Sequence, residues 1–155
     1  MEFWMFDTPL GTMAAGEEAG ALTRLWLPGQ PIPRLMPHKT PLLERCGGQI
    51  MEYLNGQRQV FDLPLMPAGT PFQRLVWKAL QDIPYGKTES YGSIAARLGR
   101  PGAARAVGMA NHRNPLPILI PCHRVVGAKG QLTGYAGGLA LKQALLELEG
   151  RKNLL

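Results

Sequence analysis

The chain has 155 residues and a formal net charge of +6, a length that suits one compact domain or two small ones without disulfide or metal staples. Its only two cysteines, Cys46 and Cys122, exclude a disulfide scaffold and indicate a reduced, cytosolic protein. The N-terminus has acids where a signal peptide needs basic residues, and no apolar run reaches membrane-spanning length. We therefore expect a cytoplasmic protein, in the bacterial cytosol or, in a eukaryote, the nucleus.

The first part of the chain predicts a small sheet and one helix. Short apolar and aromatic runs at 2–6 and 21–27 predict two strands. The segment 28–41 holds five prolines and predicts a loop, because proline continues neither a helix nor a central strand. Over 42–55 apolar residues recur at helical spacing, which is compatible with a helix that is interrupted or relaxed at the glycine pair 47–48.

A second proline-rich segment, 62–71, holds three prolines and predicts a linker. It separates an expected N-terminal α/β domain at 1–66 from a second domain at 67–155. The fold class that we expect is therefore α/β (α+β), with a small N-terminal sheet domain and a mainly helical C-terminal domain.

The second domain opens on a clear helix start. Thr70 can cap the helix, Pro71 suits its first position, and Gln73 completes a T-x-x-Q capping box. The helix should end near Asp82, before Pro84. Its apolar face is predicted at Phe72, Leu75, Val76, Ala79 and Leu80.

Two more helices follow in a helix-turn-helix pattern. Ser90 can cap the first of them, and Gly99 can stop it. Arg100 and Pro101 start the next helix, G-A-A-R-A-V-G-M-A, which ends at 111–115. Its small side chains suit either close approach to a DNA groove or tight packing on a neighbour.

The last third of the chain predicts a winged form of this fold. Apolar runs on both sides of Cys122 predict short strands, and the glycine-rich stretch 127–138 predicts a hairpin or wing. A final helix carries Leu141, Leu145 and Leu148 on one face and stops at Gly150. Glu149 lies on its last turn, where a carboxylate opposes the helix dipole and needs another reason to be present.

Positive charge is concentrated in one region. From Ser90 to Leu146 there is no Asp or Glu, and such a stretch attracts nucleic acid or is an ordinary solvated face. Its basic residues are Arg97, Arg100, Arg105, Arg113, Arg124, Lys129 and Lys142.

Residues 120–127 read I-P-C-H-R-V-V-G. A thiol is a strong nucleophile only as thiolate, and the imidazole of His123 can take the proton of Cys122 directly or through a water. Cys46 has no base among its neighbours and is predicted to be a buried apolar residue. Cys122 is therefore the candidate for chemistry, with hydrolysis, redox reactions and group transfer all open.

The run R-A-V-G-M-A-N-H-R-N-P-L-P-I-L-I-P-C-H-R-V-V-G, followed by G-Y-A-G-G-L-A-L-K and L-E-G, closely resembles the O6-alkylguanine-DNA alkyltransferases, the methylated-DNA–protein-cysteine methyltransferases. The resemblance covers residues 70–150. It implies that Cys122 irreversibly accepts the alkyl group from O6 of guanine, so that one molecule repairs one lesion, with O4-alkylthymine as a further substrate to test.

The resemblance also implies catalytic roles. His123 would act through a water as the base for Cys122, and Glu149 would stabilise the charged histidine. Asn114 would brace the turn before the strand of Cys122, and the hydroxyl of Tyr135 would donate to the departing guanine.

DNA handling follows from the resemblance in the same way. Arg105 would replace the extruded base in the stack, Tyr91 would help to rotate the nucleotide beside its 3′ phosphate, and the thin helix would lie in the minor groove. The residues expected to bind DNA are Arg105, Tyr91, Ala103, Ala104, Arg113 and Arg124. The expected partner is duplex DNA with O6-alkylguanine, bound by a monomer that is cooperative on DNA.

The sequence departs from the family pattern in two places. Ala136 stands where many members carry serine, so one hydroxyl donor near O6 is missing; this substitution bears on rate and alkyl preference and not on the identity of the reaction. The N-terminal half lacks the Cys and His cluster with which some relatives bind zinc, because His38 and Cys46 alone cannot make a four-ligand site. We expect neither a metal nor a cofactor.

Three other functions compete with suicide alkyl transfer. A non-catalytic lesion binder would keep the fold but lack the reactive cysteine, which is present here. A helix-turn-helix regulator would need side chains that read base edges, and the thin helix offers few. A thiol hydrolase would turn over, which a stable thioether does not allow.

Overall fold

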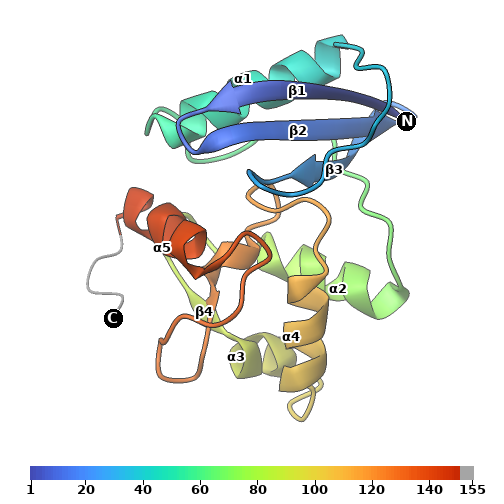
Figure 1. Cartoon of the computed structure of the whole chain (residues 1–155). Coiled ribbons are helices and arrows are strands. Elements are labelled where there is room, and N and C mark those ends of the chain that lie inside the picture. The colour runs from blue at the N-terminus through green and yellow to red at the C-terminus, as the bar shows by residue number, and fades with distance from the viewer. Residues whose placement is uncertain (151–155) are drawn as a thin grey trace. The chain divides into compact units, whose positions relative to one another are not determined.

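The computed structural model describes residues 1–150 and separates into two compact units (Figure 1). The first unit spans Met1–Ala68, and the second begins at Gly69. Both contain helices and strands, which confirms the predicted α/β class. Across the described residues, every helix falls short of the length and hydropathy that crossing a bilayer requires.

A three-stranded antiparallel sheet organises the first unit. It consists of β1 (Glu2–Thr8), β2 (Gly11–Glu18) and β3 (Ala21–Trp26) in that spatial order. β1 and β3 match the predicted strands, whereas β2 was not predicted, because G-T-M-A-A-G-E-E has no aromatic and only one β-branched residue. Its pairing with both neighbours and the burial of Ala14 and Ala15 outweigh its low strand propensity.

The two faces of this sheet are covered differently. On one face Phe3, Ala14 and Trp26 form an apolar cluster against which Ile32 packs. Ile32 belongs to the proline-rich segment, which has no helix or strand at 27–40, so the predicted loop is confirmed. Its backbone is tied to β1 where the His38 N–H donates to the Phe3 carbonyl at 2.9 Å.

The helix α1 (Pro41–Leu54) packs on the other face (Figure 1). Thr40 caps it by accepting from the Leu43 N–H. Of the two alternatives at the glycine pair, an interruption is excluded, because the helix is continuous. Gly47 instead allows close packing: a Cβ built there would lie 3.3 Å from the ring of Phe6, whereas a Cβ at Gly48 would meet nothing within 4 Å.

These two glycines should respond oppositely to alanine. Gly48→Ala should raise the free energy of unfolding by about 0.5–1 kcal/mol, since alanine is the better helix former at this exposed position. Gly47→Ala gains the same propensity but displaces Phe6, and overpacking costs about 1–3 kcal/mol. Urea denaturation of the two variants measures the difference. Equal stabilisation by both would contradict the close contact.

The segment after α1 attaches to the sheet before it leaves the unit. The Leu22 N–H donates to the Pro64 carbonyl, and the Met66 N–H donates to the Leu22 carbonyl, both at 2.8 Å. The first half of the predicted linker therefore pairs with β3, and the change of unit follows at Ala68.

The second unit begins with α2 (Pro71–Leu80), where the predicted capping box is present: Thr70 accepts from the Gln73 backbone, and the Gln73 side chain accepts from that of Thr70. The predicted apolar face is partly wrong. Leu75 is 46% exposed, and Trp77, which was not assigned to that face, is buried. The Trp77 indole N–H donates to the Ala110 carbonyl at 2.8 Å and so joins α2 to α4.

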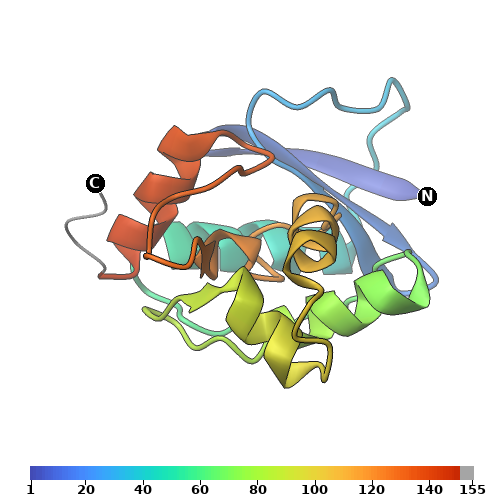
Figure 2. The ribbon, with the colours of Figure 1, turned by 90° about the horizontal axis from the view of Figure 1, so that it is seen from below.

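The helix-turn-helix is confirmed as α3 (Tyr91–Arg97) and α4 (Ala104–His112), which pack together (Figures 1 and 2). Ser90 caps α3 as predicted. β4 (Glu89–Ser90) precedes α3 and pairs in parallel with β5 (Val125–Val126). Helix α4 ends at His112, within the range 111–115 in which its end was predicted.

The region around the cysteine differs from the prediction. Cys122–Arg124 forms a 3₁₀ turn rather than a strand, and only β5 follows it. The glycine-rich stretch contains no strand and is closed by a hydrogen bond from the Gly127 N–H to the Gln131 carbonyl at 2.9 Å. It is a loop-like wing rather than a hairpin. The last helix, α5 (Leu139–Leu148), is followed by Glu149 and Gly150, the latter with a φ of 96°.

Candidate active site

A strained turn lies in the loop between α4 and the cysteine. The Leu119 N–H donates to the Pro117 carbonyl at 2.9 Å, and Ile118 between them has a φ of 72°. A left-handed backbone at a β-branched residue costs about 1–3 kcal/mol, which the surrounding structure must offset. Ile118 is buried, so packing holds the turn in place. Such fixed, strained turns are typical of functional loops.

A second tight turn immediately precedes the thiol. The Cys122 N–H donates to the Ile120 carbonyl at 2.7 Å around Pro121. Asn114 ties this turn to the preceding loop through two hydrogen bonds. Its Nδ2 donates to the Ile120 carbonyl at 2.8 Å, and its Oδ1 accepts from the Leu116 N–H at 3.0 Å. The position of the sulfur therefore depends on backbone geometry that Asn114 fixes.

Cys122 is 3% exposed and carries a free thiol. Burial raises the pKa of Cys122 to about 11, although a hydrogen bond from Asn114 and the positive charge of Lys142 act in the opposite direction. The thiol is therefore protonated at neutral pH, and its activation requires a base.

His123 has the properties of that base. It is fully buried, and its Nε2 lies 2.8 Å from Oε2 of Glu149. Burial lowers the pKa of His123, although the hydrogen bond and charge of Glu149 act to raise it. The imidazole is therefore neutral at neutral pH. When Nε2–H donates to the carboxylate, the tautomer leaves Nδ1 as the proton acceptor.

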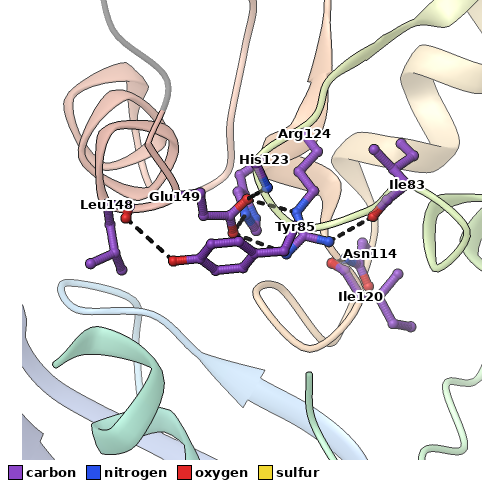
Figure 3. Close-up of polar contacts among 9 residues, drawn as sticks. Ile83, Tyr85, Asn114, Ile120, His123, Arg124, Leu148 and Glu149 are labelled. Atoms are coloured by element: carbon purple, nitrogen blue, oxygen red, sulfur yellow. Dashed lines mark hydrogen bonds and ion pairs between the residues drawn. The ribbon is translucent and has the colours of Figure 1, made fainter. Parts of the chain in front are cut away.

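The Glu149 carboxylate accepts hydrogen bonds from several directions (Figure 3). Besides Nε2 of His123, its donors are Nε of Arg124 at 2.8 Å, Nη2 of Arg124 at 3.0 Å and the Gly86 N–H at 3.2 Å. These contacts explain why a carboxylate stands at the C-terminal end of α5, where the helix dipole alone would disfavour it.

Arg124, which was predicted to bind DNA, lies within this buried network. Its side chain is buried, its guanidinium pairs with both oxygens of Glu149, and Nη1 donates to the Ile83 carbonyl at 2.7 Å (Figure 3). The structure shows that it fixes the carboxylate that holds His123.

Lys142 is a second cation that the sequence analysis did not place in the site. It is fully buried on α5, and its Nζ donates to the Thr133 carbonyl at 3.1 Å. The predicted face of α5 is rotated by one residue, because Lys142, Leu145 and Leu146 are the buried positions. Their i, i+3, i+4 spacing was a signal that could have found Lys142.

The residues predicted to contact DNA lie mostly on α4. Ala103 and Ala104 are half-buried at its start, and Arg105 is exposed in its first turn. The exposed residues from there to the end of the helix and its cap are Arg105, Ala106, Met109, His112 and Arg113. Tyr91, at the start of α3, lies against α4: a Cβ added to Gly108 would be 3.6 Å from the Tyr91 ring.

Comparison with known proteins identifies this arrangement. Residues 71–151 match the family model of the 6-O-methylguanine DNA methyltransferase DNA-binding domain. The chain is 44% identical to a methylated-DNA–protein-cysteine methyltransferase of Methanosarcina acetivorans, covering 97% of this chain and 99% of the relative. It is 48% identical to the constitutive enzyme of that name from Bacillus subtilis, covering 92% of each.

The chain belongs to the 6-O-methylguanine DNA methyltransferase family. The fold agrees, because the crystal structure of a Mycobacterium tuberculosis OGT in complex with DNA superposes with a TM-score of 0.89 at 45% identity, covering 96% of this chain and 92% of that one. The family resemblance that the sequence indicated is therefore confirmed.

In this methyltransferase family member, fewer cations of the acid-free stretch 90–146 are free at the surface than the sequence suggests. Arg124 and Lys142 are buried, and Arg97 pairs with Glu89 at 2.8 Å. The exposed cations that remain in the acid-free stretch are Arg100, Arg105, Arg113 and Lys129.

Three further positions bear on the family's chemistry. Tyr135 is buried, whereas its neighbour Ala136 is exposed. Cys46 is buried as predicted, and burial raises its pKa to about 12, so it stays a protonated thiol. Within residues 1–150, groups of three or more His, Cys, Asp or Glu with metal-binding geometry are absent.

Proposed function

We propose that this protein repairs DNA by transferring an alkyl group from O6 of guanine to Cys122, once per molecule. The observation that carries the proposal is the buried relay, in which Cys122 is followed by His123 and the latter is held by Glu149 at 2.8 Å. A protonated thiol beside a neutral, carboxylate-bound histidine is an activated nucleophile of the Cys-His-carboxylate kind.

The reaction balances as a displacement at the alkyl carbon. Cys122 gives its proton to His123, directly or through a water, and Glu149 stabilises the imidazolium that forms. The sulfur then bonds to the carbon while the C–O6 bond breaks and its electron pair goes to guanine. Tyr135 and nearby backbone N–H groups donate hydrogen bonds to the guanine anion that this creates, and the Tyr135 hydroxyl gives it the one proton that makes it neutral guanine. The proton that His123 took from Cys122 then restores the phenol, directly or through a water. The thioether has no easy hydrolytic exit.

The buried thiol requires that the damaged nucleotide leave the duplex, at a cost of about a few kcal/mol. In this proposal Arg105 fills the space that the extruded base leaves in the stack. Tyr91 contacts the phosphate of the rotated nucleotide, and Arg113 contacts the DNA backbone. Ala103 and Ala104 let the start of α4 approach the minor groove. The DNA complex of the M. tuberculosis relative supports DNA as the partner.

The division of labour between domains is also a proposal. Residues 67–155 would bind DNA and accept the alkyl group, and residues 1–66 would form the N-terminal α/β domain. We propose a monomer that binds DNA cooperatively, in the reducing cytoplasm that the free thiols suit. The methyl group of Ala136 supplies no donor, so backbone N–H groups would do the work that serine does in many relatives.

Mass spectrometry tests alkyl transfer directly. Incubation with duplex DNA carrying O6-methylguanine should add one methyl group per protein molecule, located on Cys122. Cys122→Ala should bind the duplex without any gain in mass, whereas Cys46→Ala should react like the wild type. A wild-type protein that binds the lesion tightly at unchanged mass would instead be a non-catalytic lesion binder.

A further inference from the structure

Thr133 contacts two groups that belong to different helices. Its hydroxyl forms a short hydrogen bond with the Tyr91 phenol at the start of α3. Its carbonyl accepts from Nζ of Lys142 on α5 at 3.1 Å. Thr133, in the glycine-rich loop, therefore links Tyr91, which we assign to the DNA, with Lys142, the cation near Cys122.

The contact with Lys142 fixes the backbone of Thr133. An ammonium that is fully buried must be hydrogen-bonded, because an unpaired buried charge is very costly. The Thr133 carbonyl satisfies part of this requirement, so movement of the loop away from α5 would break a hydrogen bond to a buried charge. This matters because the loop has no strand pairing of its own to hold it.

The contact with Tyr91 fixes the phenol in turn. One side of the ring approaches α4 at Gly108, which has no side chain, and the hydroxyl meets Thr133. A threonine hydroxyl has one proton and can either donate to Tyr91 or accept from it. When Thr133 donates, the phenolic proton of Tyr91 remains available to a third group.

We propose that Thr133 is a positioning residue for alkyl transfer, which donates to the Tyr91 oxygen and so directs the Tyr91 O–H toward the rotated nucleotide. The inference rests on the proposed function. It assigns to Thr133 a role through Tyr91, and to Lys142 the role of anchoring the loop that carries Thr133. Hydrogen bonds in such a chain polarise and strengthen one another.

Single-turnover kinetics with an O6-methylguanine duplex test this role, at protein concentrations that separate DNA affinity from the limiting rate constant of transfer. Thr133→Val, which removes the hydroxyl at nearly constant shape, should lower the limiting rate constant about tenfold, equivalent to the loss of one net hydrogen bond. Affinity for undamaged duplex should change less than about twofold. Thr133→Ser, which keeps the hydroxyl, should transfer at nearly the wild-type rate.

A double-mutant cycle with Tyr91→Phe distinguishes positioning from a merely structural role. If Thr133 acts through the phenol, Thr133→Val should have no further effect in the Tyr91→Phe background. The inference would be overturned if the effects of the two substitutions on the limiting rate constant were additive. It would also be overturned if Thr133→Val left that rate constant unchanged, or if Thr133→Ser and Thr133→Val lowered it equally. If the wild type itself adds no methyl group to Cys122, the proposed function fails instead, so the two failures are distinguishable.

Discussion

Glu149→Gln is expected to lower the free energy of unfolding by about 3–5 kcal/mol, the usual cost of removing one partner from a buried ion pair. The carboxylate pairs with Arg124 and holds His123, and all three side chains are buried. Glutamine is neutral and presents an NH₂ group where one carboxylate oxygen accepted hydrogen bonds. The guanidinium is left with an uncompensated charge.

The same substitution should slow alkyl transfer about 100-fold or more, because His123 loses the group that orients it and stabilises its charged form. Urea denaturation and single-turnover transfer measure the two effects. Glu147→Gln is the matched control, since Glu147 lies two residues earlier at the end of α5, is exposed and accepts a hydrogen bond from the Gln143 side chain at 3.0 Å.

A double variant separates stability from catalysis. Glu149→Gln combined with Arg124→Met removes both charges and should recover part of the lost stability, because the stranded guanidinium is gone. It should not recover the transfer rate, because His123 still lacks its carboxylate. If Glu149→Gln alone were as stable and as fast as Glu147→Gln, the network would have neither role.

Local signals in the sequence predicted several parts of this fold correctly. The capping box of Thr70 and Gln73 and the cap at Ser90 depend on side chains that bond to their own helix. The dipeptide Cys122-His123 likewise indicated a nucleophile and its base. Such features need no knowledge of distant segments, so they can be read before the fold is known.

The features that were missed depend on contacts with other segments of the chain. The strand β2 forms because two neighbours pair with it, and Gly47 is tolerated in α1 because Phe6 packs there. Arg124 looked like a DNA ligand until Ile83 and Glu149 were seen to bind it. Charge in a sequence does not reveal whether a side chain meets solvent or a buried partner.

The base role of His123 predicts how transfer depends on pH. With a pKa of about 11, Cys122 is ionised in roughly one molecule in ten thousand at pH 7. Burial lowers the pKa of His123, so the imidazole is neutral at pH 7 and above. The reactive combination of neutral base and protonated thiol is therefore fully populated from pH 7 to 9, and the wild-type rate should be flat over that range. It should fall only in acid, where His123 becomes protonated.

Removing the base should change the shape of this profile. In His123→Asn the thiol must ionise before it reacts, so the rate at pH 7 should drop about 100- to 10,000-fold. It should then rise about tenfold per pH unit from pH 7 to 9, because the thiolate fraction rises by that factor below its pKa. Single-turnover transfer at saturating protein gives the profile of each protein.

His38→Asn is the control for this comparison, because His38 is exposed in the first unit, where its Nδ1 lies 2.8 Å from Oε2 of Glu2. It should keep the flat wild-type profile. A wild type whose rate rises tenfold per unit would mean that its thiol ionises without help from His123. A flat profile in His123→Asn would mean that another group takes the proton. Because the two mechanisms differ in slope and not only in rate, a variant that is merely destabilised cannot imitate the expected result.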